Sequence, residues 1–111
     1  ETTSVPTIHE LIYELEAEIN NGGFDQFFSN SAGDCTEETI LALTKIGATR
    51  TAEIVRKAAS KFPGGMPSKD RDERQDMLEV VSPDSDAFEE LDEEFLAYED
   101  DLASLVANYK G

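Results

Sequence analysis

Apolar residues recur at helical spacing along almost the whole chain, and this periodicity is the feature that most limits its fold. Near the start, five aliphatic residues share one face of a helix: Ile8, Leu11, Ile12, Leu15 and Ile19. No stretch alternates apolar and polar residues as a half-buried strand does, and no long internal repeat is present. We therefore expect an all-α fold, a compact single-domain bundle of about six or seven helices.

Local signals mark the first two helices. Thr7 and Glu10 form the capping-box pattern that begins a helix, and the Asn-Asn-Gly-Gly run at residues 20–23 favours its end. Three phenylalanines then repeat the i, i+3, i+4 spacing: Phe24, Phe27 and Phe28. We expect them in a short helix of two turns that forms the centre of the core.

The middle of the chain predicts two more helices and a loop. Asp34 or Thr36 is expected to cap a helix that reaches Gly47, and the next helix is predicted over residues 49–61. Residues 63–68 hold two prolines and two glycines, so we expect no regular structure there.

The last third is predicted to be helical as well. Asp70 or Asp72 is expected to cap a helix that ends at the Ser-Pro-Asp run of residues 82–84. A heptad-like apolar stripe then extends over residues 88–109 and fits either a core face or a dimer seam. The acidic run at 99–101 leaves open whether this segment is one helix or two, the second capped by Asp100 or Asp101.

Length and charge limit the chain further. Its 111 residues suffice for one domain, and we expect a single acidic domain over residues 1–111. With 9 basic and 25 acidic residues, its net charge is −16. Such a chain is unsuited to direct nucleic-acid binding or to an anionic membrane surface. A cationic protein is the natural partner, although high acidity also serves solubility alone.

Catalytic and metal-binding constellations are incomplete. The single His9 and the single Cys35 cannot build a zinc site of the usual ligands, and no phosphate-binding glycine loop is present. We therefore expect no enzyme activity, no metal and no cofactor. A lone cysteine, no apolar run of membrane-spanning length and no signal-peptide pattern at the start of the chain favour a cytoplasmic location.

The acids are unevenly distributed. Residues 1–44 carry a net charge of −9, residues 45–74 carry +4, and residues 75–111 carry −11. Ten carboxylates fall within residues 84–101. On a helix that is one charge per about 2.7 Å of axis, of the same order as the one per about 1.7 Å of duplex DNA.

Helical phase suggests which acids face a partner. If the apolar stripe points inward, four acids point outward: Glu89, Glu90, Glu93 and Asp100. Three others lie beside them: Asp86, Glu94 and Asp101. Glu10 and Glu14, on the solvent face of the first helix, complete the candidate partner-binding set. A solvated helix face is the alternative interpretation of these acids.

The segment Asn-Gly-Gly-Phe-Asp-Gln-Phe-Phe-Ser-Asn-Ser-Ala-Gly at 21–33 resembles the signature of a bacterial family, the DNA-mimic proteins of the neisserial type. Segments at 46–54 and 91–102 are also similar to that family, so the resemblance covers about residues 8–109. It implies an all-helical domain that forms a dimer. It further implies carboxylates presented to the DNA-binding face of a helix-turn-helix transcription regulator.

Two functional hypotheses follow. The first is a non-enzymatic DNA mimic that binds a basic DNA-binding protein, such as a transcription regulator, and competes with DNA. The alternative is an acidic interaction or immunity-type module that neutralises another cationic protein. An enzyme would require a concave pocket with a desolvated carboxylate. We also expect a homodimer, because the C-terminal stripe holds more apolar residues than a small monomer easily buries.

Overall fold

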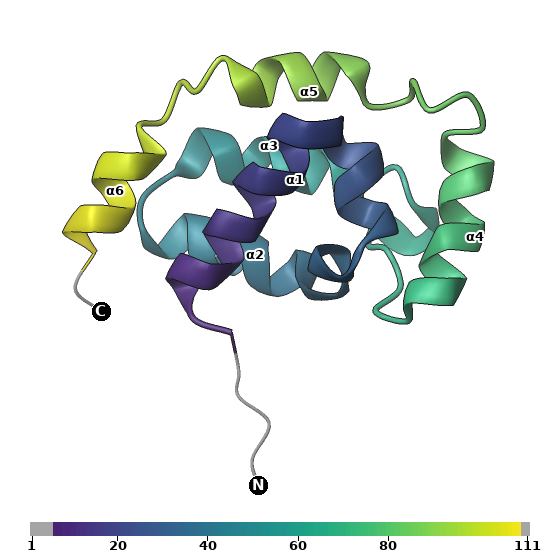
Figure 1. Ribbon diagram of the computed structural model, residues 1–111, viewed down its shortest axis with the longest axis horizontal. Helices are drawn as coiled ribbons and strands as arrows, with labels where there is room; N and C mark the ends of the chain where they lie inside the picture. The colour runs from purple at the N-terminus through teal and green to yellow at the C-terminus, as the bar shows by residue number, and fades with distance from the viewer. Residues whose placement is uncertain (1–5, 110–111) are drawn as a thin grey trace, which may run out of the picture.

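The computed structural model describes residues 6–109, and every regular element in that range is helical (Figure 1). The α-helices are α1 (Ile8–Ser29), α2 (Thr36–Lys45), α3 (Thr49–Ala59), α4 (Arg71–Val81), α5 (Glu89–Leu96) and α6 (Leu102–Asn108). Two short 3₁₀ helices are η1 (Ser31–Cys35) and η2 (Pro63–Gly65). The predicted all-α class is confirmed.

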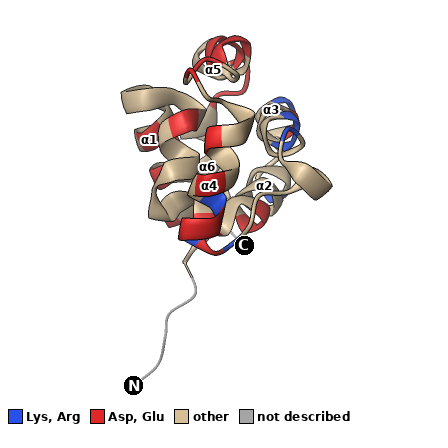
Figure 2. Ribbon diagram, turned by 90° about the vertical axis from the view of Figure 1, so that its right-hand side faces the viewer, with Lys and Arg blue, Asp and Glu red and all other residues tan. Residues whose placement is uncertain are grey.

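The helices surround α1. In Figure 1, α2 and α3 lie behind α1, α5 crosses above it, and α4 and α6 lie at opposite ends of the molecule. Figure 2, turned by 90°, shows α5 at the top and α4 on the side that faces the viewer. The acidic helices α4 and α5 are therefore both peripheral.

A kink at Gly23 divides α1 into the two helices that the sequence predicts. Gly23 has φ of 73°, which disfavours any residue with a side chain. The Asp92 carboxylate accepts a hydrogen bond of 2.8 Å from the Phe24 amide, which the kink leaves without a helical acceptor. A Cβ at position 23 would overlap that carboxylate. The predicted capping box of Thr7 and Glu10 is present at the start of α1.

Aromatic side chains form the centre of the core, as predicted for Phe24, Phe27 and Phe28, which are fully buried. The Phe28 ring lies 4.8 Å from that of Phe62 and 5.4 Å from that of Phe88, measured between centroids. These rings join α1 to the segments that follow α3 and precede α5. The core thus links residues from all parts of the chain.

The predicted cap of α2 is wrong, whereas the predicted cap of α4 is confirmed at Asp70. Cys35, and neither Asp34 nor Thr36, occupies the N-cap of α2. The Thr36 hydroxyl donates to the Gly33 carbonyl, and Asp34 binds arginines instead. Asp70 is the N-cap of α4 by position, but its side chain makes no capping hydrogen bond.

The C-terminal segment is two helices, which decides the question that the sequence left open. The break lies between α5 and α6, and Asp101 caps α6 by accepting a hydrogen bond from the Ser104 amide. Most of the apolar stripe belongs to the core, since Phe88, Leu91, Phe95 and Leu102 are buried. Residues 63–68, predicted to be irregular, contain the single turn of η2.

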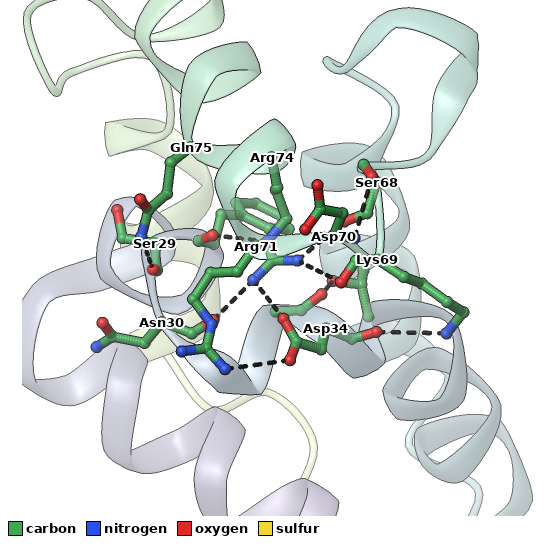
Figure 3. Close-up of polar contacts among 12 residues, drawn as sticks. Ser29, Asn30, Asp34, Ser68, Lys69, Asp70, Arg71, Arg74 and Gln75 are labelled. Atoms are coloured by element: carbon green, nitrogen blue, oxygen red, sulfur yellow. Dashed lines mark hydrogen bonds and ion pairs between the residues drawn. The ribbon is translucent and has the colours of Figure 1, made fainter.

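Arg74 is the one charged side chain in the interior of the described chain, and it has no exposed surface. Its guanidinium donates to the carbonyls of Phe28, Asn30 and Ser68 and to the Asp34 carboxylate, at 2.7 to 2.9 Å (Figure 3). Burial opposes ionisation of Asp34, but the hydrogen bonds from Arg74 and Arg71 hold its pKa below the usual value. One side chain thereby joins α1, η1, α4 and the preceding loop.

Arg74→Met is expected to lower the free energy of unfolding by about 3 to 5 kcal/mol, because it leaves buried acceptors and a carboxylate without their donor. Arg71→Met is the matched control, since the Arg71 side chain is half exposed, and it should cost about 1 kcal/mol or less. Urea denaturation of both variants measures the difference. Equal costs would show that the buried network does not anchor α4.

Candidate functional site

Four acids of the predicted set lie together on one exposed surface. Asp86 precedes α5, and Glu89, Glu90 and Glu93 project from its first turns. Each is exposed, and none of these carboxylates is in a hydrogen bond or ion pair within residues 6–109. This group is available to a partner.

Two predicted acids face α3 instead. Glu94 forms an ion pair with Arg50 at 3.1 Å. Asp100, expected to point outward, accepts hydrogen bonds from the Thr51 amide at 2.7 Å and from its hydroxyl at 2.9 Å. The expectation failed because α3 begins after Ala48, which has no side-chain acceptor for the free amides of the first turn, so Asp100 caps that helix from across the chain.

The other three predicted acids do not join this surface. Asp101 caps α6, and the Glu10 carboxylate accepts from the Thr7 amide at 2.9 Å in the capping box. Glu14 is exposed, but its charge acts on Cys35 and it is thus near η1 rather than α5. Glu10 and Glu14 therefore add no charge to the α5 surface.

Sequence reasoning missed a row of acids on α4. Asp72, Asp76 and Glu79 occur at i, i+4 and i+7, so they share one helix face, and all three are exposed. The spacing itself predicts an acidic helix face, but Arg71 and Arg74 in the same helix make the net charge of this segment look less acidic. We use the name anionic ridge for these three acids together with the exposed acids of the α4–α5 loop and of α5 that have no side-chain partner in the described chain: Asp72, Asp76, Glu79, Asp84, Asp86, Glu89, Glu90 and Glu93.

The anionic ridge carries closely spaced charge. Helical rise puts the three α4 acids about 5 Å apart along the axis, against about 3.4 Å between charges on one DNA strand. The red segments in Figure 2 extend from α4 up to α5. None of the eight carboxylates has a side-chain partner among the residues that the structure describes.

The cations of the described chain lie elsewhere. Arg50, Lys69, Arg71 and Arg74 form ion pairs, all with acids outside the anionic ridge. The remaining four are exposed on or next to α2 and α3: Lys45, Arg56, Lys57 and Lys61. Figure 2 shows the basic residues of α3 to one side of α4 and α5. The molecule therefore has a distinct anionic side.

The sequence also matches a known protein family. Residues 10–110 match the family of DMP19-like proteins, which is nearly the whole chain. The chain belongs to the DMP19-like family. Comparisons with curated proteins and with solved structures gave no match.

The segment at 21–33 that resembles the DMP19-like signature is largely structural. It holds the Gly23 kink, the core phenylalanines and the η1 turn. Gly33 has no room for a side chain, because a Cβ there would meet the Arg74 guanidinium and the Phe27 carbonyl. The signature therefore specifies the fold, whereas the anionic ridge lies after it in the sequence.

A polar hollow of about 400 Å³ lies beside the anionic ridge, between α1, α4 and the α4–α5 loop. Burial, together with the charge of Asp86, raises the pKa of Asp25 in this hollow, although a Ser82 hydrogen bond acts in the opposite direction. The hollow is thus a concave site with a partly desolvated carboxylate, the kind of feature that an enzyme hypothesis requires. Its other polar lining groups are three serines, Gln75 and Glu79.

Other chemical sites have little support. No group of three or more His, Cys, Asp or Glu side chains in the part of the chain described here is placed to hold a metal ion. Burial raises the pKa of the Cys35 thiol, which disfavours the reactive thiolate. Within residues 6–109 no helix combines the length and the apolar character needed to cross a bilayer.

Mild acidification is expected to stabilise the fold. Burial raises the pKa values of Asp25 and Asp92, so the folded state binds their protons more tightly than the unfolded state. The free energy of unfolding should therefore rise as the pH falls from 7 towards the ordinary values, 3.8 for Asp and 4.5 for Glu. Below them it should fall, because ion pairs lower the pKa values of Asp34 and Glu38.

Asp25→Asn should reduce the gain in stability that urea denaturation measures as the pH falls from 7 towards 3.8, the ordinary value for Asp. The matched control is Asp76→Asn, which removes the same charge from the exposed face of α4. It should retain the wild-type pH dependence. If the two variants behave alike, overall charge repulsion rather than the half-buried Asp25 carboxylate determines the effect.

Proposed function

We propose that the chain is a non-enzymatic DNA mimic that binds the DNA-binding face of a basic protein, a helix-turn-helix transcription regulator, and competes with DNA. One observation carries the proposal. This member of the DMP19-like family has eight exposed carboxylates on α4, on α5 and in the loop between them, with no side-chain partner within the described residues. A protein that reads duplex DNA presents lysines and arginines to a row of negative charges.

The distribution of ion pairs supports this function. Every lysine or arginine that forms an ion pair within residues 6–109 does so away from the anionic ridge, at Asp34, Glu38, Glu53, Glu94 or Glu99. The ridge keeps its full charge and attracts a cationic surface over a distance of about a Debye length, 10 Å at 0.1 M salt. The exposed cations of α3 would repel such a surface, so the ridge is the side presented to the partner.

Glu89→Gln combined with Glu93→Gln should weaken binding to the regulator by about tenfold at low salt and make its salt dependence shallower, because fewer ions are released. Glu14→Gln with Glu37→Gln is the control, since it removes two exposed, unpaired charges away from the ridge. The regulator would be isolated from native cytoplasm with the wild-type chain as bait. Fluorescence anisotropy with the purified regulator would measure affinity.

Duplex DNA tests the mimicry itself. Excess operator DNA should displace the wild-type chain from the regulator. A ternary complex of DNA, regulator and this chain would exclude mimicry and favour the acidic neutralising module. Equal affinity of the ridge and control variants would exclude the ridge as the binding surface.

We further propose a homodimer through the apolar groove between α1 and α6. The groove has a volume of about 340 Å³ and is lined by Ile12, Leu102 and Val106, next to Tyr13, which is 73% exposed. Because two chains of −16 repel, the dimer should tighten as salt increases, opposite to partner binding. Sedimentation at tens of micromolar should show this, and Tyr13→Ser should weaken the dimer. A monomer at both low and high salt would remove the dimer.

A further inference from the structure

The polar hollow beside the anionic ridge has walls from three parts of the chain. Three elements supply the lining residues: α1 (Asp25 and Ser29), α4 (Gln75, Leu78 and Glu79) and the loop that follows α4 (Ser82, Pro83 and Ser85). Its volume of about 400 Å³ lies at the small end of the range of ligand sites, about 300 to 1,000 Å³. It suits one side chain or one small molecule.

Asp25 lacks a cation. No lysine or arginine within residues 6–109 forms an ion pair with Asp25 or Glu79. Burial raises the pKa of Asp25 and the charge of Asp86 acts in the same direction, while a Ser82 hydrogen bond opposes them in part. A bound cation would offset the cost of partly burying the Asp25 charge and the repulsion between Asp25 and Asp86. The hollow therefore favours a positively charged occupant.

We propose that this hollow is the socket for a single arginine side chain of the DNA-binding partner. The proposal rests on the proposed function and deepens it, because it adds one specific contact to the general attraction of the anionic ridge. Glu79 belongs to both the hollow and the ridge. The attraction that the ridge carboxylates exert on an arginine therefore extends to the hollow.

The lining fits a guanidinium better than an ammonium. A guanidinium is planar, is weakly hydrated and directs five N–H donors to several acceptors at once. The Asp25 and Glu79 carboxylates provide acceptors on two walls. Gln75 donates its amide hydrogen to the Ser29 carbonyl at 2.6 Å, which leaves its side-chain oxygen free to accept. Leu78 and Pro83 add apolar surface on which the flat face of the guanidinium can rest.

The test uses N-acetyl-arginine amide as the probe, titrated into the isotope-labelled full chain and followed by NMR. The neutral citrulline analogue and the lysine analogue are the comparison ligands. We expect saturable shifts at Ser29, Gln75 and Ser85 with the arginine probe, no such shifts with citrulline, and at least tenfold weaker binding of lysine. Asp25→Asn should weaken arginine binding at least tenfold, and the control Asp76→Asn less than twofold.

Several results would overturn the proposal. They are shifts spread over all exposed acids, equal losses in the two variants, or lysine binding as tight as arginine. The thermal midpoint of Asp25→Asn, expected at or above that of the wild type, shows that the variant is folded. The probe experiment needs no partner, so its failure leaves the ridge variants to judge the proposed function. Probe binding together with a regulator indifferent to Asp25→Asn would assign the hollow to a free guanidinium compound and reject the partner's arginine.

Discussion

A buried guanidinium holds the acidic side of this protein in place. In α4 only Arg74 and Leu78 are buried, so the helix has little apolar surface with which to attach itself to the core. Arg74 compensates by donating to backbone carbonyls at the end of α1 and in the loop before α4, and to Asp34. These bonds fix the rotation of α4 about its axis. That rotation directs Asp72, Asp76 and Glu79 into solvent.

Two groups of carboxylates in this chain have different roles. One group replaces missing backbone partners: Asp92 binds the amide exposed by the kink at Gly23, and Asp100 and Asp101 cap α3 and α6. Each of these satisfies an amide that a helix end leaves free. The carboxylates of the other group, the anionic ridge, make no hydrogen bond or ion pair in the described part of the chain. Because the capping carboxylates and the ridge carboxylates are different residues, substitutions that remove ridge charges should have little effect on stability.

Sequence periodicity predicted the helices and the aromatic core well, because apolar spacing alone determines which face of a helix is buried. The sites of Asp34 and Asp100 could not be predicted in this way. Both carboxylates sit near helix ends and look like local caps, but each binds a group more than 35 positions away in the chain. Where a polar side chain has several possible partners, the tertiary structure determines which of them it binds. The same applies to Arg74, whose burial no local pattern indicates.

The family signature and the anionic ridge are separate sources of evidence, because the signature at 21–33 and the ridge after residue 71 share no residue. The signature explains the kink, the core and the turn that receives Arg74. Asp25 is the exception, since it belongs to the signature but lines the hollow beside the ridge. Phe24, which precedes Asp25, and Phe27, two residues after it, are fully buried. The backbone of Asp25 is therefore anchored by the core, and no lysine or arginine within residues 6–109 forms an ion pair with its carboxylate, which is why we propose this group as the one that selects a basic side chain of the partner.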